Sequence, residues 1–231
     1  MSVFKFKEFS IIQKNSAMKV GTDGVLLGSW VSCEKASNIL DIGCGTGLIT
    51  LMLAQRNLSS NVTAIEIDKK SSKEAQLNIS NSDWEERIEI IYTSLQQFNS
   101  KIKFDLIISN PPFFSQNKSK KSRDIARHTN ALSFEELINN AAKLLKKKGV
   151  FSVIIPKYYE EYFCEIANIY KLYCIRVCYV KGSAGSEVKR VMLEFSFIKS
   201  TALVEHLTIE KSRHNYTDEY IQLCHIFYLN M

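Results

Sequence analysis

The possible folds of this chain are narrowed first by a glycine-rich turn, Asp41-Ile42-Gly43-Cys44-Gly45-Thr46-Gly47. An apolar run of strand character, residues 38–42, leads into the turn, and residues 48–56, which have helical character, follow it. Glycines let a backbone bend sharply and approach a ligand closely. The spacing is Gly-x-Gly-x-Gly, not the Gly-x-Gly-x-x-Gly typical of pyrophosphate sites, which favours a ligand without phosphates.

An acidic residue completes this pattern. Glu66 ends the next apolar run, close to the roughly 20-residue offset at which a carboxylate binds ribose hydroxyls. Asp68 is the alternative residue for that role. Turn and carboxylate together predict a site for an adenosine moiety, whereas the plainer interpretation is an ordinary strand-to-helix turn with a glutamate on the surface.

Short apolar runs alternate with helical stretches, which is typical of an α/β fold with a mostly parallel sheet and helices on both faces. The predicted strands are residues 38–42, 62–67, 88–92, 104–109 and 150–155. The predicted helices between them are residues 48–56, 71–80 and 133–147. The last of these begins with capping-box spacing at Ser133 and stops before Gly149.

The pattern changes after Pro156. One more helix, residues 158–170, precedes two β-rich runs, residues 172–180 and 190–198, and the glycines between these runs suit a hairpin turn. The sheet is therefore expected to end in an antiparallel hairpin. A final helix is expected within residues 216–229.

The composition fits a single domain over residues 1–231, since 45% of the residues are apolar and 23% are charged. We divide it into an N-terminal segment, 1–37, which is expected to cover the cofactor site, and a core with the C-terminal helix, 38–231. Neither a membrane span nor a signal peptide is recognisable, so a cytoplasmic protein without a membrane partner is expected. The six cysteines lack metal-ligand spacing and are interpreted as buried free thiols, with no metal.

The chemistry is indicated by Ser109-Asn110-Pro111-Pro112-Phe113-Phe114, directly after the predicted strand 104–109. An amino group on an aromatic ring is a poor nucleophile because its lone pair is delocalised. The side-chain oxygen of Asn110 and the carbonyl of Pro111 can each accept one of its hydrogens, which localises and aims the lone pair. Pro112 stiffens the turn, and Phe113 is placed to stack on an extruded base. The alternative is a loop held only by its aromatic side chains.

Basic residues follow the proline turn. The chain has a formal net charge of +6. The basic run is expected to form a flap beside the site, and the candidates for phosphate binding lie on it: Lys118, Lys120, Lys121, Arg123 and Arg127. A solvated loop explains such a charge run equally well. Lys146, Lys147 and Lys148 are expected instead to complement the negative end of their helix.

Strand, DIGCGTG and the later acidic residue resemble the cofactor motif of class I S-adenosylmethionine methyltransferases, which have a Rossmann-like fold. The resemblance implies S-adenosyl-L-methionine as cofactor. It places Gly43, Cys44, Gly45 and Gly47 at the methionine and ribose, Asp41 near the amino group, and Asn110 at the reacting methyl. Many members contact the cofactor adenine with an Asp after the third strand, and here Ser94 stands at that position.

Across nearly the whole chain the sequence also resembles the bacterial valine-tRNA adenine methyltransferases. The segments FKFKEF, MKVGTDGVLLG, NPPFF and YTDEY carry this resemblance. It implies N6-methylation of the tRNA adenosine on the 3′ side of the anticodon, with tRNA as partner. The sequence does not give the oligomeric state, and a monomer is favoured. Residues 19–24 either cover the cofactor or begin a helix that packs through Val25, Leu26 and Leu27. The rival hypotheses are methylation of rRNA, methylation of a protein glutamine, and a non-catalytic RNA-binding module.

Overall fold

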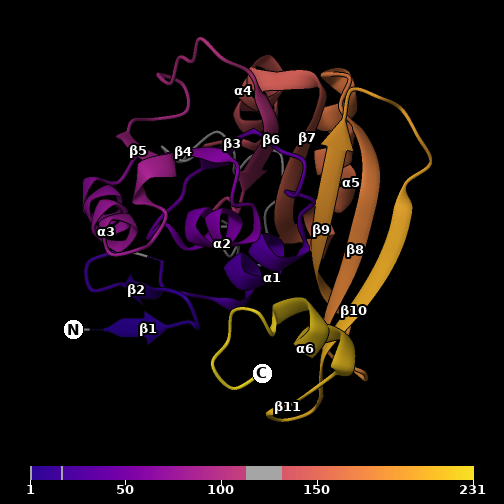
Figure 1. Cartoon of the computed structure of the whole chain (residues 1–231). Coiled ribbons are helices and arrows are strands. Elements are labelled where there is room, and N and C mark those ends of the chain that lie inside the picture. Colours follow the sequence, from indigo (N-terminus) through magenta and orange to yellow (C-terminus); the bar gives the residue numbers. More distant parts are fainter. Residues whose placement is uncertain (1, 17, 113–131) are drawn as a thin grey trace.

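A nine-stranded sheet forms the centre of the computed structural model, which describes residues 2–16, 18–112 and 132–231 (Figure 1). The strand order is β11-β10-β8-β9-β7-β6-β3-β4-β5. The strands are β3 (Asn38–Ile42), β4 (Asn61–Glu66), β5 (Ile88–Tyr92), β6 (Phe104–Ser109), β7 (Leu145–Pro156), β8 (Tyr173–Ser183), β9 (Val188–Ser196), β10 (Leu203–Ser212) and β11 (Asn215–Tyr216).

The strands from β5 to β7 pair in parallel, and β9 runs antiparallel to both β7 and β8. The predicted mostly parallel sheet with a closing antiparallel hairpin is therefore confirmed. Beyond the hairpin, β10 adds in parallel to β8, and the short β11 pairs with the end of β10.

Helices cover both faces, as predicted, because successive strand residues point to opposite sides. On β3, Ile39 belongs to one core cluster and Leu40 to the other. The first cluster includes side chains of α1, α2 and α6, and the second includes side chains of α4 and α5. The helices are α1 (Thr22–Trp30), α2 (Leu48–Arg56), α3 (Lys69–Ser80), α4 (Phe134–Leu144), α5 (Glu160–Ile169) and α6 (Asp218–Cys224), with 3₁₀ turns at Glu85–Arg87 and Lys157–Tyr159.

The N-terminal residues form a two-stranded antiparallel ribbon, β1 (Val3–Lys5) and β2 (Ser10–Ile12). Phe6 and Phe9, between these strands, are buried in the first core cluster. The chain after α6 folds back onto this ribbon, where the Lys7 amide donates to the Phe227 carbonyl at 2.8 Å. The predicted C-terminal helix is thus shorter than residues 216–229.

The helix expected over residues 133–147 ends earlier, and its three lysines have a different role. The predicted capping box at Ser133 is present, but α4 ends at Leu144, and β7 begins at Leu145. Lys146, Lys147 and Lys148 therefore lie on a strand, where Lys146 pairs with Asp105 at 2.8 Å. Gly149 is not a helix stop; a side chain there would lie 3.0 Å from the Phe104 carbonyl on β6.

Four of the six cysteines are buried free thiols, as predicted, whereas Cys164 and Cys174 are only half-buried. No helix among the described residues is long and apolar enough to cross a bilayer.

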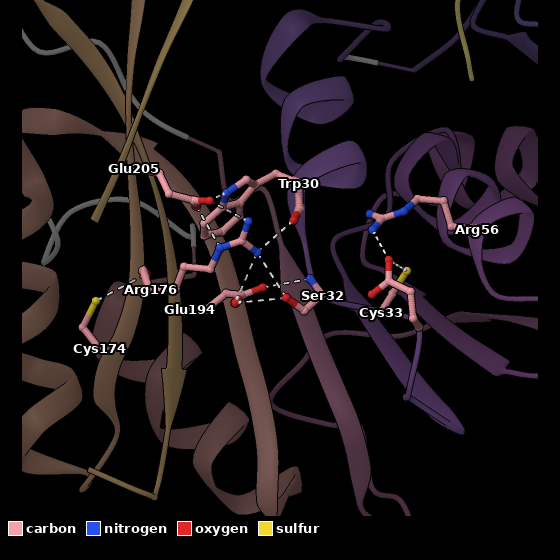
Figure 2. Close-up of polar contacts among 9 residues, drawn as sticks. Trp30, Ser32, Cys33, Arg56, Cys174, Arg176, Glu194 and Glu205 are labelled. Atoms are coloured by element: carbon pink, nitrogen blue, oxygen red, sulfur yellow. Dashed lines mark hydrogen bonds and ion pairs between the residues drawn. The ribbon is translucent and has the colours of Figure 1, made fainter. Parts of the chain in front are cut away.

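A cluster of polar side chains ties the C-terminal end of α1 to β8, β9 and β10 (Figure 2). The guanidinium of Arg176 lies 4.1 Å from the centre of the Trp30 ring and donates to the Trp30 carbonyl and to Ser32. The same group pairs with Glu205 at 2.8 Å and faces Glu194 at 3.7 Å. This end of α1 is therefore fixed to the sheet.

Candidate active site

The carboxyl ends of β3, β4 and β6 border a cavity of about 540 Å³. In the sheet, β3 lies between β4 and β6, which is the point where the strand order reverses and where open α/β sheets bind ligands. The predicted site residues that line this cavity are Gly43, Cys44, Gly45, Glu66, Asn110, Pro111 and Pro112.

The glycine turn has the backbone conformation that its sequence requires. Gly43, Gly45 and Gly47 have φ of +73°, +57° and +81°, a region that residues with side chains rarely adopt. A side chain at Gly47 would also lie 3.5 Å from the Cβ of Ala75 on α3. The turn therefore brings the bare backbone of Gly43 and Gly45 to the cavity wall, whereas Gly47, also predicted to border the cofactor, packs against α3 and does not line the cavity.

Glu66 is fixed at the end of β4 by main-chain donors. Its two carboxylate oxygens accept hydrogen bonds from the amides of Gly45 and Asp68, both at 2.8 Å. Each oxygen keeps a second lone pair for a hydroxyl donor. Asp68 lines the cavity too, but its carboxylate caps α3, and the hydrogen bond from the Ser71 amide lowers its pKa. Glu66 is thus the better placed of the two for ribose hydroxyls.

Asp41 lies behind the turn, not in the wall of the cavity. It is 1% exposed, and one of its carboxylate oxygens accepts a hydrogen bond from the Thr50 hydroxyl at 2.6 Å. The other oxygen is buried without a partner among the described residues. Burial, and to a lesser degree the charge of Glu66, raises the pKa of Asp41 to about 7.

The residues after β5 form the wall farther from Asn110. Thr93, Leu95 and Gln96 line the cavity, whereas Ser94, the predicted adenine contact, does not. The Ser94 hydroxyl accepts instead from the Gln97 amide at 3.3 Å. A role for Ser94 in cofactor binding stays a prediction.

Asn110 carries the polar group on the opposite wall. Its side-chain oxygen is buried and has no hydrogen-bond partner among the described residues. Ser109, one residue earlier, donates to the Ile42 carbonyl at 2.9 Å and holds this end of β6 against β3. Pro111 is buried and Pro112 is exposed. An acceptor that is desolvated and unsatisfied is prepared to bind a donor from a ligand.

The first turn of α1 closes the cavity beside Asn110. Lys19, Thr22 and Asp23 line it, and a side chain at Gly24 would lie 4.0 Å from the Asn110 amide nitrogen. Arg190 on β9 holds Asp23 through an ion pair at 2.7 Å. The alternative in which Val25, Leu26 and Leu27 pack a helix onto the sheet is confirmed, since all three are buried in the core. The same helix lines the cavity with its first turn, and the alternative in which this segment covers the cofactor stays a prediction.

Phe113 and the predicted phosphate-binding residues, Lys118, Lys120, Lys121, Arg123 and Arg127, lie outside the described residues. Their roles stay predictions.

Comparisons with known proteins agree with this geometry. The model of the methyltransferase small domain family matches residues 16–166. A tRNA1(Val) (adenine(37)-N6)-methyltransferase from Phocaeicola vulgatus is 46% identical over 99% of this chain and 98% of its own length. One of the same name from Flavobacterium psychrophilum is 47% identical over 99% and 100%. The chain belongs to this methyltransferase family.

Solved structures support the methyltransferase fold. A predicted O-methyltransferase from Agrobacterium tumefaciens superposes with a TM-score of 0.69 at 20% identity, covering 88% of this chain and 96% of the other. A putative RNA methyltransferase from Pyrococcus horikoshii superposes with a TM-score of 0.55 at 17% identity, covering 76% and 82%. The predicted Rossmann-like class I fold is thus confirmed.

For this member of the family, the structure adds wall residues after β5 that the sequence did not predict as site residues. It also places in the wall Thr22 and Asp23, from the segment 19–24 that was expected either to cover the cofactor or to begin a helix. Thr93, Leu95 and Gln96 follow β5, and Thr22 and Asp23 begin α1. The first group carries a detectable signal, because residues directly after a parallel strand lie at the ligand-binding edge. The second group reaches the site only because α1 packs across that edge.

Proposed function

We propose that this enzyme transfers a methyl group from S-adenosylmethionine to N6 of an adenosine in tRNA, the one on the 3′ side of the anticodon of a valine tRNA. The observation that carries the proposal is the side-chain oxygen of Asn110, which is buried and has no partner in the part of the chain that the structure describes, in the wall of the same cavity as the glycine turn and Glu66. The names of the full-length relatives support tRNA as the substrate.

The residues present fit S-adenosylmethionine. A cavity of about 540 Å³ is within the range of small-molecule sites. Glu66 offers free lone pairs to ribose hydroxyls, and the turn at Gly43 and Gly45 offers backbone without obstructing side chains. Ile67 and Leu95 give apolar surface for the adenine ring, with Thr93 and Gln96 as polar neighbours. The cofactor, when bound, supplies an electrophilic methyl group.

The N-terminal segment fits a covering role. Met18 and Lys19 lie at the cavity with the first turn of α1. Because that turn borders Asn110, we assign it to the side where cofactor and target base meet. Water is thereby excluded from part of the reacting centre, which strengthens hydrogen bonds made there.

Asn110 and Pro111 promote methyl transfer by positioning the adenine amino group. The Asn110 side-chain oxygen and the Pro111 carbonyl accept the two hydrogens of the adenine amino group, so its lone pair points at the methyl group. These hydrogen bonds strengthen as the nitrogen gains positive charge during transfer. The methylated nitrogen is acidic and releases its proton through these acceptors or to water. No residue with a raised or lowered pKa is required for this step.

Substitution of Asn110 by alanine tests the mechanism. We expect Asn110→Ala to lower the rate of methyl transfer by at least about a hundredfold, the scale of losing one preorganised hydrogen-bonding group. Cofactor affinity measured by calorimetry should stay nearly unchanged. Asn61→Ala, an exposed asparagine at the amino end of β4, is the matched control and should retain wild-type activity.

The substrate is tested by incubating the enzyme with labelled cofactor and with total RNA or total protein from cells that lack it. Label on N6 of adenosine in a valine tRNA is the expected result. Label confined to rRNA or to protein glutamine would overturn the proposed substrate. No cofactor binding at millimolar concentration would favour an inert RNA-binding module, and an Asn110→Ala rate within a few-fold of wild type would refute the mechanism.

A further inference from the structure

A second cavity, of about 890 Å³, lies beside the active site. We call it the terminal groove and define it by Phe4, Lys5, Lys189, Tyr216 and Tyr228, which line it. Thr22 lines both the terminal groove and the active-site cavity, so the two lie next to each other on either side of this residue. β1, β11 and α6 lie at the same end of the molecule, together with both chain termini (Figure 1).

The size of the active-site cavity makes such an extension necessary. A cavity of about 540 Å³ has the size of a single small-molecule site, and the cofactor and one base already occupy it in the proposed reaction. The nucleotides on either side of the target adenosine therefore need a surface outside it. Because Thr22 lies in both linings, the terminal groove is the neighbouring surface that a strand leaving the cavity past Thr22 would meet.

The lining of the groove suits single-stranded RNA. Phe4, Tyr216 and Tyr228 are half-buried and pack against the first core cluster, so part of each side chain stays exposed. The Phe4 and Tyr228 rings pack edge to face, with their centres 6.3 Å apart. Unpaired bases stack on such aromatic side chains with little dependence on sequence. Aromatic surface beside a nucleoside site therefore favours RNA over a protein segment.

Charge agrees with this assignment. Lys5 and Lys189 are exposed, and neither forms an ion pair with another described residue. Lys19, also exposed, lines the active-site cavity. Glu210 is the opposing charge in the lining, where its carboxylate accepts a hydrogen bond from the His214 amide. The exposed ammonium groups are available to neutralise phosphates.

We infer that the terminal groove binds the tRNA nucleotides next to the methylated adenosine. Lys5 and Lys189 contact phosphates, and the rings of Phe4 and Tyr228 stack on a base. This inference rests on the proposed function, because it takes the active-site cavity as the place where the target adenosine is held.

Charge reversal tests the inference. The variant Lys5→Glu/Lys189→Glu should raise the tRNA concentration for half-maximal rate by at least about tenfold, and should leave the saturated rate and the cofactor affinity within about twofold. Fluorescence anisotropy gives the slope of the logarithm of the tRNA binding constant against the logarithm of the salt concentration. This slope should become less steep by about two, one for each phosphate that a lysine no longer neutralises. The matched control is Lys147→Glu/Lys148→Glu, which makes the same charge change on exposed residues at the amino end of β7. These exposed substitutions leave the core intact.

The outcomes separate this inference from the proposed function. If the wild type methylates tRNA but the two double variants behave alike, the groove does not bind RNA and the inference is wrong. If the wild type binds tRNA through these lysines without methylating it, the groove stands and the proposed reaction fails. If the wild type binds no tRNA at all, both are wrong.

Discussion

Replacing Arg176 by methionine should destabilise the protein strongly, because it leaves a buried carboxylate without its cation. Glu194 is 3% exposed, and burial raises its pKa, an effect that Ser32 and Arg176 oppose. Among residues 2–16, 18–112 and 132–231, the donors that remain for Glu194 in the variant are the Ser32 amide, at 2.9 Å, and the Ser32 hydroxyl. Methionine keeps the aliphatic length of arginine, so the change removes charge and hydrogen bonds more than volume.

The magnitude follows from the degree of burial. Removing one partner of a buried ion pair costs about 3–5 kcal/mol. The Arg176 and Glu205 side chains are 20% and 33% exposed, so we expect a smaller loss, about 2–4 kcal/mol. At about 2–4 °C per kcal/mol for a chain of this size, the melting temperature should fall by roughly 5–15 °C. Lys211→Met, which breaks the exposed pair with Asp218, should cost less than about 1 kcal/mol.

A second substitution isolates the cause. Glu194→Gln in the Arg176→Met background removes the unpaired charge and should recover about 1–2 kcal/mol. The pH dependence has a defined sign. Because the folded-state pKa of Glu194 lies above its ordinary value, the free energy of unfolding falls as the pH rises above that ordinary value towards the folded-state pKa. Losing Arg176 raises the Glu194 pKa further, so the stability gap to wild type should widen towards neutral pH. Urea denaturation followed by circular dichroism measures the wild type and the three variants. A loss below 1 kcal/mol, or no recovery in the double variant, would refute the reasoning.

Two further predictions concern the glycine turn. Gly47→Ala places a side chain at a φ of +81° and against Ala75, so it should cost about 1–2 kcal/mol of stability and weaken cofactor binding in calorimetry; unchanged affinity would contradict it. Asp41→Asn removes a carboxyl group whose folded pKa, about 7, lies above its ordinary 3.8, and whose contribution to stability therefore falls as pH rises through that window. Between pH 5 and pH 8, the free energy of unfolding of Asp41→Asn, measured by urea denaturation, should rise by roughly 2–3 kcal/mol relative to that of the wild type. A stability difference that does not change with pH would show that Asp41 does not titrate in this range.

The central strands were predictable because both faces of a parallel sheet are buried and their residues form continuous apolar runs. The strand β10 was not predicted. It lies near the edge of the sheet, where Leu203 is 58% and Val204 55% exposed, and its sequence mixes charged and apolar residues. Its place depends on pairing with β8, which no local pattern encodes.

The N-terminal ribbon has a signal in the sequence, although it was not predicted as a strand. Phe4 and Phe6 alternate with Lys5 and Lys7, and this period of two is typical of a strand with one buried face. The three lysines before Gly149 led to a wrong prediction, because basic residues before a glycine are typical of a helix end. Local sequence does not reveal that Leu145 and Gly149 pack at Phe104, which starts the strand earlier.

The site was predictable to the extent that strand ends determine it. In the sheet, Ile42 on β3 is paired with Ser109 on β6 and with Ile65 on β4. The next residue on each strand is Gly43, Asn110 and Glu66, so three motifs that are distant in the sequence reach one level of the sheet together. A slip of one residue between β3 and β6 would turn the Asn110 side chain to the opposite face. The hydrogen bond from Ser109 to the Ile42 carbonyl holds this register, and the direction of the Asn110 side chain follows from it.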